Sequence, residues 1–225
     1  MRKILSALFF AVAILSQTYA QKNLEWGVKA GVQLSQFRGN PLTIESSAMP
    51  VGASTEAPPT VGYAVGAYFK TTESVFLQGE VMLSVKGANI KPLAITSTSK
   101  TTKVQYTQLD IPLSIGYRHK IWEVSGGPLI SVQLADDGEL KKLLGTFLGK
   151  EPPFKVFVPY TFGYQLGGGV HVGKLLVGVR YLSSIMPVTS QVINYTIPNA
   201  TPPERQSRFE QRSSVWQFSL ALRIN

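Results

Sequence analysis

Two limbs of alternating apolar and polar residues between Gln108 and Leu134 predict a β-hairpin. Side chains of a β-strand point to opposite faces in turn, so a period of two residues is the signature of a strand with two different faces. The apolar face of the first limb consists of Leu109, Ile111, Leu113, Ile115 and Tyr117, and its polar face of Asp110, Pro112, Ser114, Gly116 and Arg118. His119 and Lys120 separate this limb from the second, which starts at Trp122. We expect these two residues to form the turn.

The polar face of this hairpin limits the environments in which it can fold. Asp110, Arg118 and Glu123 lie on it together with glycines and serines, and so many charges do not suit the core of an ordinary β-sandwich. An apolar face outside and a polar face inside is the pattern of a membrane-spanning β-barrel. The alternative is a soluble, lipocalin-like barrel, which would turn the apolar faces inward around a ligand.

The same alternation recurs along the chain and predicts eight strands. They are expected at residues 24–37, 61–69, 75–88, 108–118, 122–134, 160–172, 175–185 and 216–224. The connections alternate between long and short: residues 38–60, 89–103, 135–159 and 186–213 are long, whereas 71–74, 119–120 and 173–174 are tight turns. We therefore expect an all-β, eight-stranded antiparallel up-and-down transmembrane β-barrel, with four long external loops and three tight periplasmic turns. Within the third long loop, Asp137 is expected to start a short helix that ends at Leu148.

The start of the chain predicts export. Arg2 and Lys3 precede an apolar run, and small residues around Ala20 suit a signal peptidase, so residues 1–20 are expected to be a cleaved signal peptide and 21–225 the barrel domain. No later segment approaches the roughly 20 apolar residues of a helical span. The chain has no cysteine, which excludes a disulfide framework. Its formal charge of +9 would suit an acidic partner, but export argues against nucleic acid. The expected location is the outer membrane.

Charged residues on the polar faces fall into two layers when positions are counted from the tight-turn end. The layer near mid-height contains Lys29, Glu80, Asp110 and Arg180, and the layer at the periplasmic rim contains Glu25, Arg118, Glu123 and Arg223. An eight-stranded barrel is only wide enough for side chains to fill. We therefore expect a structural plug in which Lys29 and Arg180 pair with Glu80 and Asp110, since unpaired buried charges are costly.

An enzymatic role for these charged residues, or for the histidines, has less support in the sequence than the structural plug. Glu80 and Asp110 could act as an acid and base, but no nucleophile stands beside them. His119 and His171 are the two histidines, and their spacing gives neither a Ser/His/Asp constellation nor a zinc motif. His119 is expected in a turn and His171 at the rim. The sequence therefore predicts no enzymatic activity, no cofactor and no metal.

Several strings in the predicted strands carry a family resemblance. They are WGVKAG at 26–31, LQGE at 77–80, LDIPL at 109–113, GYR at 116–118, GGP at 126–128 and GVRY at 178–181. In these strings the chain resembles the PorT-like outer-membrane β-barrel family of Bacteroidetes. The resemblance implies a non-enzymatic outer-membrane protein that is structural or an accessory in protein secretion or cell-surface assembly. The implied partners are outer-membrane lipid and other envelope or secretion proteins. A small-solute pore and a lipocalin-like ligand-binding barrel remain the alternatives.

Overall fold

The structure of the chain is a computed structural model. The structure describes residues 24–39, 42–44, 51–54, 58–93, 102–136, 138–139, 142, 157–196 and 204–225. The predicted signal peptide lies outside these residues and stays a prediction. Of the predicted helix from Asp137 to Leu148, only Gly138, Glu139 and Lys142 are described, and the Lys142 amide donates to the Gly138 carbonyl at 3.0 Å. Among the described residues, no helix has the length and apolarity needed to cross a membrane.

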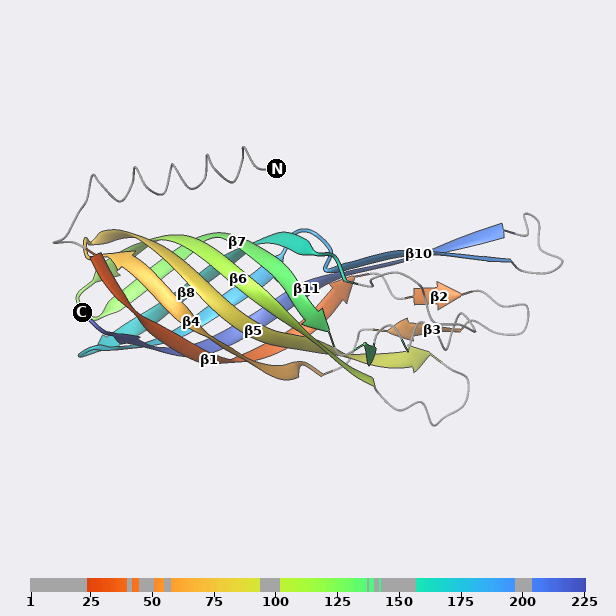
Figure 1. The fold of residues 1–225 in the computed structure, drawn as a ribbon, viewed down its shortest axis with the longest axis horizontal. Helices are drawn as coiled ribbons and strands as arrows, with labels where there is room; N and C mark the ends of the chain where they lie inside the picture. The colour runs from red at the N-terminus through yellow and green to blue at the C-terminus, as the bar shows by residue number, and fades with distance from the viewer. Residues whose placement is uncertain are drawn as a thin grey trace.

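The described residues form eleven β-strands, eight of which close into a ring (Figure 1). The strands are β1 (Leu24–Gly39), β2 (Leu42–Ile44), β3 (Val51–Ser54), β4 (Thr60–Thr71), β5 (Val75–Leu93), β6 (Thr102–His119), β7 (Trp122–Asp136), β8 (Tyr160–Val172), β9 (Leu175–Ser184), β10 (Thr189–Thr196) and β11 (Glu204–Arg223). The ring runs β1-β4-β5-β6-β7-β8-β9-β11, and antiparallel pairing of β11 with β1 closes it. The predicted antiparallel meander of eight strands is therefore confirmed.

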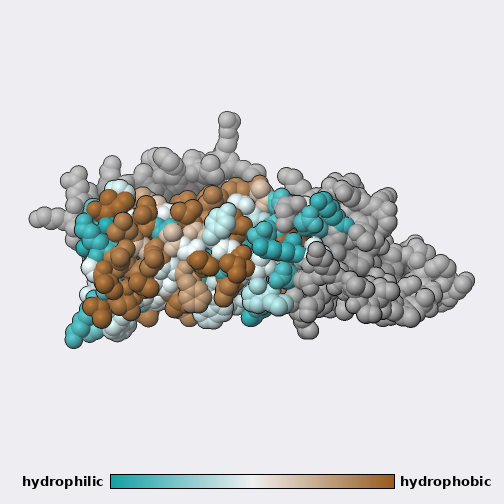
Figure 2. Space-filling view, turned by 90° about the horizontal axis from the view of Figure 1, so that it is seen from below, coloured by the Kyte–Doolittle hydropathy of each residue, from teal (hydrophilic) through white to brown (hydrophobic). Residues whose placement is uncertain are grey.

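The two faces of the strands point as the alternation predicts. On the outer face of β6, Leu113 and Ile115 are 47% and 60% exposed. On its inner face, Asp110 and Ser114 are buried. Figure 2 shows the resulting apolar belt on one face of the barrel, with hydrophilic residues at both ends of it. In water these outward apolar side chains would stay exposed to solvent, whereas in a membrane the hydrocarbon of the bilayer covers them. The lipocalin-like alternative, with apolar faces inward, is therefore wrong.

The tight turns lie at one end of the barrel, together with the C-terminus (Figure 1). Gly173 and Lys174 connect β8 to β9 as predicted, and Gly173 has a φ of 63°. The turn between β6 and β7 is shifted by one residue: His119 ends β6 and pairs with Trp122, and Lys120 and Ile121 form the turn. Lys120 takes a left-handed φ of 53°, which two-residue hairpin turns of this kind require.

At the opposite end, strands continue beyond the ring where the sequence predicts loops (Figure 1). β5 extends to Leu93 and β6 begins at Thr102, so both ends of the expected loop at 89–103 are strand. β2 and β3 lie within the expected loop at 38–60, and β10 and the first half of the long β11 lie within the one expected at 186–213. The prediction was wrong here because hydrophobic alternation marks only strands with one apolar face. The short β2 and β3 and the strand β10 lack a sustained alternation and are recognised by their backbone pairing.

Candidate functional site

The barrel interior is the candidate site, because it gathers the buried charged residues that the described strands carry. Every second residue of a strand points inward, and Glu80 of β5 lies at the centre of the first cluster. Its carboxylate accepts a hydrogen bond from Lys29 Nζ of β1 at 3.1 Å and from Arg180 Nη1 of β9 at 3.0 Å. Arg180 Nη2 and the side-chain amide of Gln78 both donate to Oε1, the oxygen nearest to Lys29 Nζ. Glu80 thus holds three strands together through two cations.

A second buried pair, Lys86 with Asp110, connects β5 to β6. Lys86 Nζ lies 2.7 and 2.8 Å from the two carboxylate oxygens of Asp110. Ser131 of β7 also donates to this carboxylate at 2.6 Å, and Lys86 donates to the Gln108 amide oxygen at 3.2 Å. Both charged groups are buried. Since a buried carboxylate is stable only with such donors, this cluster fills its part of the lumen with paired charged groups.

The third cluster lies toward the tight-turn end. Arg118 Nη2 lies 2.9 Å from Glu25 Oε1, and Arg118 Nε lies 3.5 Å from Glu123 Oε2. Lys70 Nζ also contacts Glu123, and it lies 3.8 Å from the centre of the Phe76 ring. Phe76 is packed against Gly116, where an added Cβ would lie 2.2 Å from the ring.

Two further contacts complete this third cluster. His171 Nε2 lies 2.6 Å from Glu123 Oε2. Arg223 Nη1 lies 3.7 Å from Glu25 Oε2. Two carboxylates therefore gather cations from several strands and close this end of the interior.

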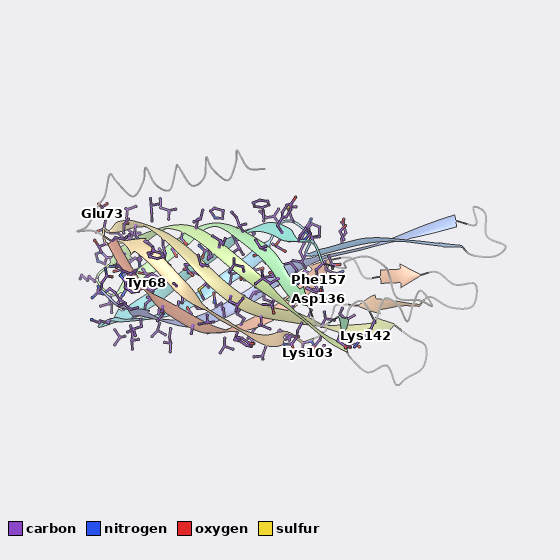
Figure 3. The ribbon with its side chains drawn as sticks, viewed as in Figure 1. Tyr68, Glu73, Lys103, Asp136, Lys142 and Phe157 are labelled. Carbon is purple, nitrogen blue, oxygen red and sulfur yellow. The ribbon has the colours of Figure 1, made fainter. Side chains whose placement is uncertain are left out.

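An apolar cluster lies inside the other end of the barrel. The rings of Phe37 and Tyr106 are stacked, and the ring of Phe157 is tilted against both, with its centroid 5.0 Å from that of Tyr106. The Tyr106 hydroxyl donates to Ser213 Oγ at 3.0 Å. Phe157, which Figure 3 shows at this end, is held by a backbone bridge to Thr189. All three rings are buried, so they form an apolar cap above the polar clusters.

Two small cavities lie between the described side chains of the interior. A cavity of about 10 Å³ lies beside Lys86, Gln108 and Leu182. Another of about 20 Å³ lies beside Lys29, Glu123 and Ser219. A cavity needs roughly 10–15 Å³ to hold a single water molecule. These spaces therefore suit one water molecule each rather than a solute.

The ion pairs in the structure differ in part from those that the sequence predicts. It brings Lys29 and Arg180 to Glu80, but it places Asp110 with Lys86, which the predicted set omits. Lys70 was also missed at the rim. Both lysines are on the inward register of their strands, so the alternation itself could have found them. The cap residues Phe37 and Tyr106 lie on the same inward register.

His119 and His171 have different neighbours and do not form a common site. The His119 ring lies near Tyr117 and Trp122, with centroids 6.4 and 5.7 Å away, whereas His171 contacts Glu123 at the rim. Within the described residues, no group of three or more His, Asp or Glu side chains could hold a metal ion.

Comparison with known proteins identifies the family. A model of the outer membrane protein beta-barrel domain matches residues 16–190, which is more than half of the chain. Among solved structures, the chain is similar to the outer membrane protease OmpT from Escherichia coli, at 11% identity and a TM-score of 0.34, over 92% of this chain and 98% of that one. Values this low carry no information on activity. Comparison with curated proteins gave no match. The chain belongs to the outer membrane protein beta-barrel domain family and is an outer-membrane β-barrel protein.

Proposed function

We propose that this barrel has no enzymatic activity and no open pore, and that it acts through the strands that extend beyond the ring at the end with the long connections. The observation that carries this proposal is the filled interior, with three clusters of buried ion pairs below an apolar cap. The water-sized cavities argue against a small-solute pore. In such barrels the tight turns are periplasmic, so the extending strands face the cell exterior.

The hairpin of β10 and β11 extends beyond the ring and has an outer edge, on β10, to which a strand of another protein can be added. β10 pairs with β11 from Thr189 to Thr196. On its other edge, the described part of the chain contributes only the bridge from Phe157 to Thr189. The unpaired backbone groups of such an edge are a template for an added strand. The proposed partner is therefore an extended segment of another envelope protein. The resemblance to the PorT-like family supports a role in secretion or cell-surface assembly.

Crosslinking on intact cells tests this proposal. A membrane-impermeant crosslinker is applied to cells that carry the wild type or a variant whose residues 192–208 are replaced by a short Gly-Ser turn. Gln211 pairs with Gly39 of β1 and with Thr189, so the ring stays closed in this variant. We expect a defined partner band for the wild type and at least a tenfold weaker band for the variant.

The matched control replaces residues 94–101, between β5 and β6, with the same linker and should keep the band. Thermal unfolding of each purified variant checks that the barrel is intact. Equal capture by the wild type and the trimmed variant, or an equal loss in the control, would contradict a binding role for this hairpin.

A further inference from the structure

Two arginines face each other on the outside of the seam that closes the ring. In the register of β1 with β11, Arg38 lies directly opposite Arg212. Both side chains are exposed, and they share the outward face of their strands, because the alternate residues Phe37 and Gln211 are buried. Like charges directly opposite each other on neighbouring strands are destabilising. An anion bound between the two guanidinium groups would reverse this repulsion.

The arginine pair lies just beyond the apolar belt. Four residues along the same face, Leu34 lies opposite Trp216, and both are exposed on the outside of the barrel. The Trp216 ring packs beside Tyr181 of β9, with centroids 5.1 Å apart. Aromatic residues of this kind mark the membrane–water interface. Four residues span about 13 Å of strand, which places the arginines at the level of lipid headgroups.

Polar groups surround the arginine pair on the same face. The amide orientation of Gln36 that satisfies both of its ends places its oxygen 3.2 and 3.1 Å from Nε and Nη2 of Arg38. Opposite Gln36 lies Ser214, whose Oγ is 2.9 Å from the Tyr181 hydroxyl. Beyond Arg212, the carboxylate of Glu210 accepts a hydrogen bond from Ser190 at 3.0 Å. The Gln36 amide oxygen therefore holds the Arg38 side chain in place, and the Ser190 hydroxyl already occupies one oxygen of Glu210.

We propose that Arg38 and Arg212 bind the phosphate group of an outer-membrane lipid headgroup. The planar guanidinium fork matches phosphate oxygens in bidentate geometry, and two forks on adjacent strands can share one phosphate. A lipid held there bridges the first and last strands of the ring. It binds the folded barrel and not the unfolded chain, so it stabilises the closed ring.

Lipid binding to the purified protein tests the site. The detergent-solubilised chain is titrated with phosphatidic acid, and native mass spectrometry measures the bound lipid. A cation near a membrane surface contributes roughly fivefold to such binding, so R38Q/R212Q should bind about 30-fold more weakly. The variant R38K/R212K keeps both charges but loses the planar fork and should bind about fivefold more weakly. The thermal shift that the lipid causes in the wild type should vanish in R38Q/R212Q.

The control K103Q removes an exposed charge at the same end of the barrel, on β6, three strands away from β1 in the ring (Figure 3). It should change binding by less than about twofold, because the site is local to the seam. Equal losses in K103Q and R38Q/R212Q would indicate diffuse attraction and overturn the proposal. Unchanged binding in R38Q/R212Q would also overturn it. If inorganic phosphate alone stabilises the wild type as strongly as the lipid does, the site binds free anions and the lipid assignment is wrong.

Discussion

Replacing Glu80 by alanine should lower the free energy of unfolding by about 3–5 kcal/mol, because it leaves two buried cations without their shared carboxylate. Lys29 and Arg180 both bind this group inside the barrel. Urea unfolding of the protein in lipid vesicles, followed by tryptophan fluorescence, measures the change.

The control for this prediction is Lys29→Ala. It should destabilise the barrel less than Glu80→Ala does, because Arg180 still neutralises Glu80. The double variant Glu80→Ala/Lys29→Ala should lose less stability than the two single losses added together, since residues of one ion-pair network are coupled. A loss below about 1 kcal/mol for Glu80→Ala would show that water or another group replaces the carboxylate.

Placing a charge on the lipid-facing surface should also be costly. Leu113→Arg puts a cation on the outer face of β6, where Leu113 is 47% exposed. Near the middle of the bilayer this change should cost about 2–4 kcal/mol. The matched control is Leu24→Arg, at the start of β1 near the tight-turn end, which should cost about 0–1 kcal/mol because it lies near the interface. The same unfolding measurement applies. Equal losses at the two positions would contradict the assigned depth of the belt.

The sequence predicts the ring well because each membrane strand carries its own signal. Alternation alone predicts that Leu113 points outward and Ser114 inward. An even number of strands also predicts that the first and last strands, β1 and β11, pair antiparallel. The strands outside the ring escape this reasoning. β10, for example, lies in a segment that the sequence predicts as a loop, and only its pairing with β11 reveals the strand.

The interior is less predictable than the faces. Alternation places Glu80, Lys86 and Asp110 inside, but their pairing depends on the stagger between neighbouring strands. In the observed register, Asp110 lies opposite Met82 on β5, and the long side chain of Lys86 reaches it from further along that strand. The position of Phe157 in the cap depends on its bridge to Thr189 and its contact with Tyr106, both of them between residues far apart in the sequence. A single strand's pattern contains no information on either feature.

The plugged interior is the central claim, and ion conductance tests it most directly. Planar-bilayer recordings of the purified wild type should show no steady conductance, because the ion-paired clusters and the apolar cap fill the lumen. Asp110→Ala and Arg180→Ala should raise the current only modestly, since each leaves the cap in place. Large, stable, ion-selective currents from the wild type would contradict the plug and establish a pore.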